Sequence, residues 1–153
     1  MAIEKPYILH MFTPTPNVSP FDVNMAYDAG YGAVMPYGNV ALDQIAGLTQ
    51  DAIFSRGPKG VKRTGIFIGG REIGLAADIL DAAKRAMVPP FEVSVFADPS
   101  GAFTTAAAMV ACVEKQLKKI HQTDLNGKNV VVLGGTGPVG AAAAVLASQA
   151  GAK

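Results

Sequence analysis

Short apolar segments alternate with longer amphipathic ones along nearly the whole chain, and this alternation constrains the fold most. Strands are expected at about residues 7–12, 33–36, 64–68, 93–97 and 129–133. Helices are expected at about residues 20–28, 42–54, 72–87, 103–120 and 138–150, with an exposed polar loop at 56–63. Strands that alternate with helices imply right-handed βαβ crossovers, so the predicted fold class is α/β with a mainly parallel sheet.

Composition excludes several classes of protein. The chain has 153 residues, of which 50% are apolar and 16% charged, and this is enough apolar material for a folded core rather than a disordered chain. A net charge of +1 gives no electrostatic reason to bind nucleic acid. No apolar run is long enough to span a membrane, and the first residues do not resemble a signal peptide. One cysteine cannot form an internal disulfide, so a reducing cytoplasm is the expected location.

A glycine-rich motif follows the last expected strand and opens the last expected helix. It has the pattern G-x-G-x-x-G and consists of Gly135, Thr136, Gly137, Pro138, Val139 and Gly140. In this context the motif predicts a dinucleotide-binding turn, in which glycines allow a tight turn and close approach to a pyrophosphate at the helix N-terminus. The expected cofactor is NADP or NAD. The alternative is a glycine-rich turn that binds no ligand.

The position of this motif suggests two domains. We expect an N-terminal α/β domain at residues 1–120, including a long connecting helix, and the start of a Rossmann NAD(P)-binding domain at residues 121–153. A Rossmann domain continues with a second strand and an acidic residue about 20 residues further on, which separates NAD from NADP preference. The sequence reaches Lys153 where that strand should begin, so we expect the second domain to be truncated.

Several ordered blocks resemble one enzyme family. They are ILHM at 8–11, SPFDVNM at 19–25, LTQDAIFSR at 48–56, RTGIFIGG at 63–70, VPPF at 88–91, VFADPSGAFTT at 95–105 and the glycine motif. Together they resemble the N-terminal part of the NAD(P)-dependent methylene-tetrahydromethanopterin dehydrogenases of methylotrophic bacteria, along essentially all of the chain. The resemblance implies a two-domain enzyme with an interdomain cleft that forms a homo-oligomer. It also implies hydride transfer from the methylene carbon of a pterin substrate to NAD(P)+, giving the methenyl cation during formaldehyde oxidation, without a metal or flavin.

Candidate substrate-binding residues lie where expected strands end, because open α/β sheets bind ligands at the carboxyl ends of their strands. These candidates are Thr13, Ser19, Asp22, Asp98, Ser100, Thr104 and Thr105. Structural explanations compete with binding: Ser19 suits a helix cap, Asp22 suits the helix dipole, and the two threonines could bond back to their helix. No catalytic residue is assigned, and Cys112 is expected to be a buried, inert thiol.

Two other functions remain open. One is a methylene-tetrahydrofolate dehydrogenase or another Rossmann oxidoreductase with a similar first domain. The other is a pterin-binding module without hydride chemistry. We also expect the isolated 153-residue chain to be inactive, because only the first βα unit of the nucleotide domain is present.

Overall fold

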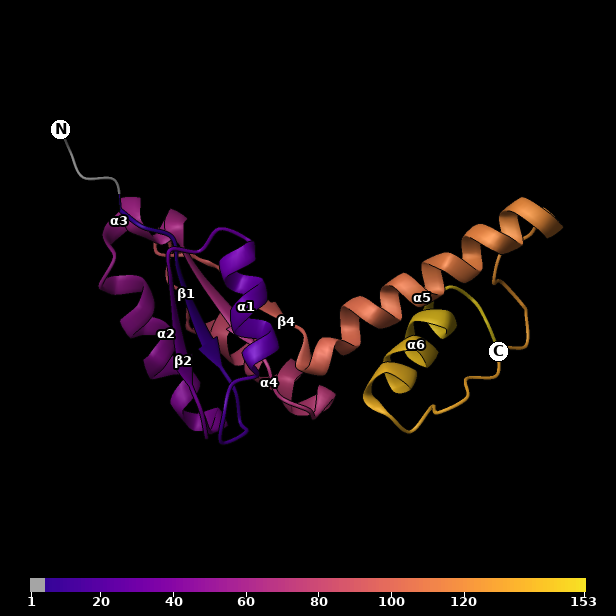
Figure 1. Ribbon diagram of the computed structural model, residues 1–153, viewed down its shortest axis with the longest axis horizontal. Helices are drawn as coiled ribbons and strands as arrows, with labels where there is room; N and C mark the ends of the chain where they lie inside the picture. Colours follow the sequence, from indigo (N-terminus) through magenta and orange to yellow (C-terminus); the bar gives the residue numbers. More distant parts are fainter. Residues whose placement is uncertain (1–4) are drawn as a thin grey trace. The chain divides into compact units, whose positions relative to one another are not determined.

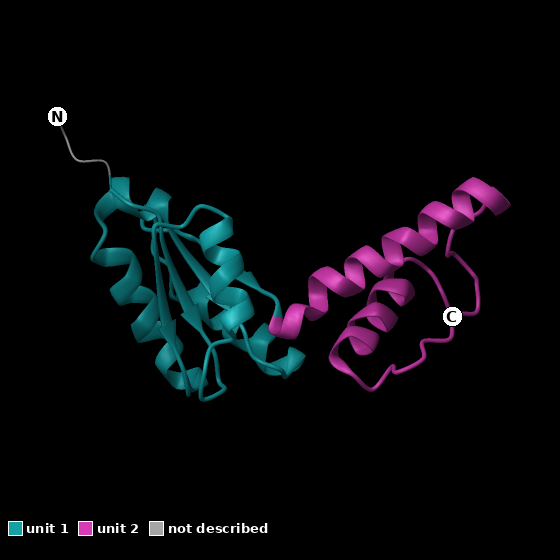
Figure 2. Ribbon diagram, viewed as in Figure 1, with its two compact units in different colours: residues 1–98 teal, residues 99–153 magenta. Residues whose placement is uncertain are grey.

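The computed structural model describes residues 5–153, and the chain divides into two compact units between Asp98 and Pro99 (Figure 2). This division differs from the predicted domains, because the long helix falls with the glycine turn and not with the first sheet. The units reflect packing alone, so the assignment of residues 1–120 and 121–153 to functional domains stays a prediction.

The first unit is built on a parallel sheet of four strands, ordered β2-β1-β3-β4 (Figure 1). The strands are β1 Ile8–Phe12, β2 Ala33–Tyr37, β3 Thr64–Ile68 and β4 Ser94–Ala97. The register aligns Phe12 with Tyr37 and Ile68, and Ile68 with Ala97, so the four strands end at one common edge. The predicted parallel α/β fold is therefore confirmed for this unit.

The helices of the first unit cover the two faces of the sheet (Figure 1). They are α1 Pro20–Asp28, η1 Leu42–Gln44, α2 Ile45–Phe54, α3 Gly57–Gly60, η2 Val61–Arg63 and α4 Ile73–Ala86. The chain moves one way from β1 to β2 and the other way from β2 through β3 to β4. Right-handed crossovers therefore place α1 on one face and α2 with α4 on the other. On the α1 face, Leu9, Met11 and Ala26 form a buried cluster with Phe67 and Val23 packed against it.

The exposed loop predicted at residues 56–63 is wrong. This segment forms the short helices α3 and η2, and Gly60 and Val61 are buried. Thr64 holds it in place, because its hydroxyl donates to the Gly60 carbonyl at 2.9 Å and accepts from Arg56 Nε at 3.0 Å. The polar composition of the segment did not reveal these two hydrogen bonds of Thr64.

The second unit is dominated by two helices packed through small residues. Its elements are η3 Pro99–Gly101, α5 Ala102–Gln116, the π-helical turn η4 Leu117–His121 and α6 Pro138–Gln149. Ala106 of α5 is buried against Ala142 and Ala143 of α6, with Val110 and Leu146 packed around them. Alanine at this contact lets the two helix backbones approach closely.

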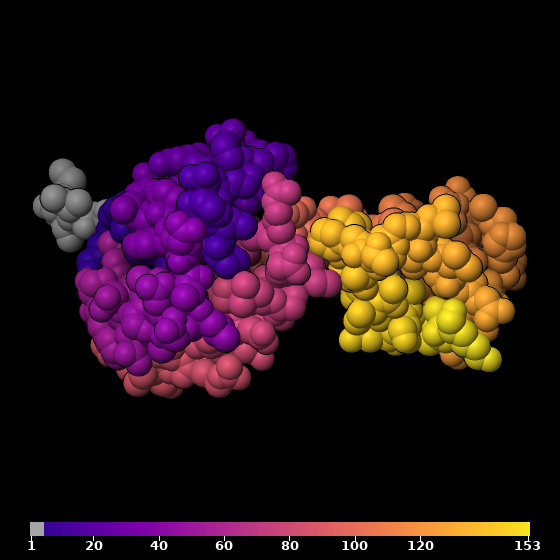
Figure 3. All heavy atoms as spheres, turned by 90° about the horizontal axis from the view of Figure 1, so that it is seen from below, coloured from indigo at the N-terminus to yellow at the C-terminus, as the bar shows by residue number. Residues whose placement is uncertain are grey.

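The strand predicted at residues 129–133 does not form. Val131 is 85% exposed and Leu133 is 92% exposed. Nevertheless, Lys153 N–H donates to the Lys128 carbonyl at 2.8 Å and Val130 N–H donates to the Lys153 carbonyl at 2.9 Å, which is the pattern of one parallel bridge. Figure 3 shows these yellow C-terminal residues against the orange segment that precedes the glycine turn. A strand needs a partner of several residues, so one bridge leaves most of this apolar segment irregular.

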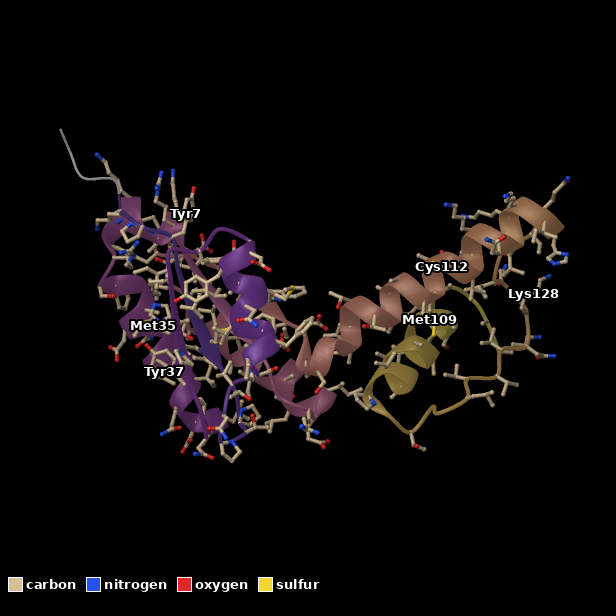
Figure 4. All side chains as sticks on the ribbon, viewed as in Figure 1. Tyr7, Met35, Tyr37, Met109, Cys112 and Lys128 are labelled. Atoms are coloured by element: carbon tan, nitrogen blue, oxygen red, sulfur yellow. The ribbon has the colours of Figure 1, made fainter. Side chains whose placement is uncertain are left out.

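Cys112 was also predicted wrongly, because its thiol is exposed rather than buried. Met109, one turn earlier on α5, is 42% exposed (Figure 4). This side of α5 is not covered by α6. Within residues 5–153, no helix has the length and apolar character needed to cross a bilayer.

Candidate functional site

The carboxyl edge of the first sheet brings together residues from three separate parts of the sequence. Gly69 N–H donates to the Phe12 carbonyl at 2.9 Å and Asp98 N–H donates to the Ile68 carbonyl at 3.1 Å, so both ladders extend one residue past their strands. Thr13, Gly69 and Asp98 therefore form a row across β1, β3 and β4. Alternation along each strand places this row on the face covered by α1.

Asp22 reaches this row from the first turn of α1. A Cβ atom added at Gly69 would lie 3.4 Å from Asp22 Oδ2, so the Asp22 carboxylate is beside Gly69 in the row. Burial raises the pKa of Asp22 above its ordinary value, and the nearby charge of Asp98 raises it further. Asp98 is itself only 8% exposed. The structure thus brings two predicted site residues together as a pair of carboxyl groups at the sheet edge.

Thr13 and Ser19 occupy different environments. Thr13 is 2% exposed, and its hydroxyl lies 2.7 Å from that of Thr15 and accepts from the Thr15 N–H at 3.3 Å. Ser19 is exposed at the N-cap of α1, but its side chain makes no capping hydrogen bond. Ser19 therefore occupies the cap position without forming the capping hydrogen bond, and its side chain is exposed. The substrate-binding role of each residue stays a prediction.

An aromatic pair lies directly behind the carboxyl row and was missed by sequence reasoning. Phe67 and Phe96 are register partners on β3 and β4, with ring centroids 6.1 Å apart. They precede Gly69 and Asp98 by two residues, so they lie on the same face. Phe96 is 52% exposed, although it lies in the sheet. The spacing of two between each phenylalanine and its edge residue was the signal that could have revealed the pair.

His10 lies on the opposite face and makes a local contact. Its Nδ1 atom is 3.1 Å from the Tyr37 hydroxyl, in the neighbouring strand (Figure 4 labels Tyr37). Burial lowers the pKa of His10, and the positive charge of Arg56 lowers it further. A neutral imidazole with a hydroxyl partner accounts for this residue without a ligand.

The remaining substrate-binding candidates belong to the second unit. Ser100 and Gly101 have φ angles of 54° and 66°, and they form the tight turn that begins α5. Thr104 Oγ1 donates to the Gly101 carbonyl at 3.4 Å, and the Thr105 hydroxyl would lie 3.8 Å from a Cβ at Gly101. Both threonine side chains are exposed. The structure therefore groups Ser100, Thr104 and Thr105 around one turn, and it supports the local bonding considered for Thr104.

The glycine motif forms a turn that suits a phosphate group. Gly137 N–H donates to the Gly134 carbonyl at 2.9 Å, and α6 begins immediately afterwards. A Cβ at Gly140 would lie 2.3 Å from the Gly134 carbonyl oxygen, so only glycine lets helix and turn pack this closely. The first N–H groups of the helix lack intrahelical acceptors and can donate to an anion. These features fit a pyrophosphate.

One detail of the turn differs from expectation. The residue with a left-handed backbone is Gly134, with φ +75°, and not Gly135, the first glycine of the motif. The pair of consecutive glycines was the signal that could have pointed to Gly134, because either one can adopt this conformation. Gly135, Thr136 and Pro138 are exposed around it.

Comparison with known proteins identifies the family. The family model described as "Methylene-tetrahydromethanopterin dehydrogenase, N-terminal" matches residues 20–100. The NAD(P)-dependent methylenetetrahydromethanopterin dehydrogenase of Methylorubrum extorquens is 56% identical over 146 residues, which cover 95% of this chain and 49% of that protein. The "Bifunctional protein MdtA" of the same organism is 38% identical over 129 residues, covering 84% of this chain and 43% of that protein. The chain thus spans about half the length of these relatives. It belongs to the methylene-tetrahydromethanopterin dehydrogenase family and represents its N-terminal region.

Proposed function

We propose that this chain is the substrate-binding part of an enzyme that transfers a hydride from methylene-tetrahydromethanopterin to NAD(P)+. The observation that carries the proposal is 56% identity, over nearly the whole chain, to a relative named for this reaction. The product is the methenyl cation, and the role is in one-carbon metabolism. A cytoplasmic homo-oligomer is part of the same proposal.

The pterin is proposed to bind at the carboxyl edge of the first sheet. There Asp22 and Asp98 can accept hydrogen bonds from ring N–H groups, and the exposed hydroxyl of Ser19 can add a further contact. Thr13 supports the edge through its bond to Thr15. In the second unit, the hydroxyls around the turn that begins α5 are proposed as further substrate contacts; they are those of Ser100, Thr104 and Thr105.

The glycine turn at residues 135–140 is proposed to hold the pyrophosphate of NADP or NAD as the first βα unit of a Rossmann domain. Close packing of Gly140 on Gly134 supports this, as does the parallel bridge between residues 129 and 153. In such a domain, the second strand would begin to pair with the first strand at this bridge. When bound, the nicotinamide ring supplies the hydride acceptor.

The protein's contribution is proposed to be orientation. The lone pairs of the two substrate nitrogens favour departure of the hydride from the carbon between them, so no protein nucleophile is required. Holding donor and acceptor at reacting distance accounts for much of such a rate enhancement.

Turnover by the full product of the gene that encodes this chain tests the proposal. Purified protein is mixed with NADP+ or NAD+ and either methylene-tetrahydromethanopterin or methylene-tetrahydrofolate, and NAD(P)H formation is followed. We expect a higher kcat/KM with the methanopterin carrier. A higher value with the folate carrier would replace the substrate assignment, and no turnover with either would overturn the proposed reaction.

A further inference from the structure

The exposed aromatic pair on the first sheet is the strongest feature that the proposed function leaves unexplained. Phe96 is 52% exposed on an edge strand, and its ring lies beside that of Phe67. Contiguous apolar side chains at a surface can mark a binding site, and these two rings are adjacent. Helix α1 covers Leu9 and Met11 on the same face, but it leaves Phe96 open.

The aromatic pair and the residues next to it form two successive rows across the strands. Phe67 and Phe96 form one row, and Gly69 and Asp98 form the next, nearer the carboxyl edge. Asp22 lies beside Gly69, because a Cβ added at Gly69 would be 3.4 Å from Asp22 Oδ2, an ordinary contact distance. The resulting surface is apolar on one side and acidic on the other.

This order matches the chemistry of a reduced pterin ring. Its pyrimidine half is flat with π faces, and the 2-amino-4-oxopyrimidine edge carries two neighbouring N–H donors. A carboxylate accepts both donors in a bidentate contact, as it does from other forked N–H groups. An aromatic face can stack on the ring while the carboxylate holds its edge.

Resting on the proposed function, we propose that Phe67 and Phe96 form the stacking surface for the pterin ring and that Asp22 accepts hydrogen bonds from its aminopyrimidine edge. Asp98, which is buried, keeps that end of the surface acidic. The aromatic pair is thus a determinant of affinity for the ring itself, independent of the rest of the substrate.

The test measures dissociation constants for tetrahydromethanopterin and for 6-methyl-tetrahydropterin, which has the ring without the long side chain. Calorimetry on the 153-residue chain compares Phe96→Leu with Phe54→Leu. Phe54 is a matched control because it is 49% exposed and pairs with Phe91 at 5.3 Å, but it belongs to α2 on the other face. We expect Phe96→Leu to weaken binding of both pterins roughly five- to tenfold. Phe54→Leu and Phe96→Tyr should bind within about twofold of the unaltered chain.

A second measurement does not depend on a folded variant. Titration of the unaltered chain, with its seven phenylalanines isotopically labelled, should shift the ring signals of Phe67 and Phe96 but leave Phe54 unchanged. Binding of either pterin with no shift at Phe96, or with equal loss in both leucine variants, would overturn the stacking surface while leaving the proposed function intact. Failure of the unaltered chain to bind either pterin would overturn both.

Discussion

Folding disfavours the ionised form of the Asp22 carboxyl group. Its pKa lies above the ordinary value of 3.8, because burial and then the charge of Asp98 disfavour ionisation. The folded state therefore binds more protons than the unfolded state between 3.8 and the raised pKa, so stability falls as pH rises through this window. We predict that Asp22→Asn raises the melting temperature at neutral pH and removes this fall, whereas pterin binding is lost.

Thermal unfolding followed by circular dichroism at a series of pH values checks this prediction. Asp28→Asn is the matched control, since Asp28 is an exposed acid on the same helix. An Asp22→Asn variant that is less stable than the unaltered chain at pH 7 would show that the carboxylate stabilises the fold, contrary to the prediction.

Thr49 presents a different case of a buried polar group. It is fully buried on α2, and its hydroxyl has no hydrogen-bond partner among the described residues. Thr49→Val keeps the shape and removes the unpaired hydroxyl, so we predict an increase of about 1 kcal/mol in the free energy of unfolding.

Thr64 provides the contrast, because its buried hydroxyl makes two hydrogen bonds, to Gly60 and from Arg56. Thr64→Val should lower the free energy of unfolding by about 1–3 kcal/mol. Urea denaturation of the two variants measures both effects. A loss of stability in Thr49→Val as large as that in Thr64→Val would indicate that the Thr49 hydroxyl has a partner.

At the scale of elements, the junction between the glycine turn and α6 depends on close backbone packing. A Cβ at Gly140 would meet Gly134 O at 2.3 Å and Gly135 Cα at 2.8 Å, and neither atom belongs to a movable side chain. We predict that Gly140→Ala lowers the free energy of unfolding by about 1–3 kcal/mol, by the mechanism of overpacking. Hydrogen exchange of the α6 amides should accelerate in parallel.

Gly74→Ala serves as the control for this substitution. Gly74 lies near the start of α4, and an added Cβ would meet nothing within 4 Å. Here alanine should stabilise the chain by about 0.4–1 kcal/mol, because it reduces the freedom of the unfolded state. Unchanged α6 exchange in Gly140→Ala would mean that the turn moves away from the helix at little cost.

The strands and longer helices of the first unit follow from local sequence pattern, but its short helices at residues 57–63 and the second unit do so only in part. Helix α1 begins at Pro20 and ends at Asp28 as predicted, because proline favours the first turn of a helix and Gly30 follows its end. The segment 129–133 has equally good strand composition, but a strand depends on backbone partners that no local pattern contains. The proximity of Asp22 and Asp98 is also absent from local pattern, since residues 76 positions apart come near each other only through the packing of α1 on the sheet.

For the whole molecule, pterin binding and hydride transfer should be separable. The proposed pterin surface lies within the first unit, whose four strands pair with one another, whereas the segment before the proposed nucleotide turn has one bridge, to residue 153. Hydride transfer needs donor and acceptor held together, and a loosely held dinucleotide loses that orientation. We predict that the 153-residue chain binds tetrahydromethanopterin but forms no measurable NADPH from methylene-tetrahydromethanopterin and NADP+.

Calorimetry measures the binding and absorbance measures NADPH formation on the same preparation, with Asp22→Asn as the binding-deficient control. Sustained NADPH formation by the unaltered chain would show that the turn and α6 alone orient the nicotinamide, and that the rest of a Rossmann domain adds affinity rather than function.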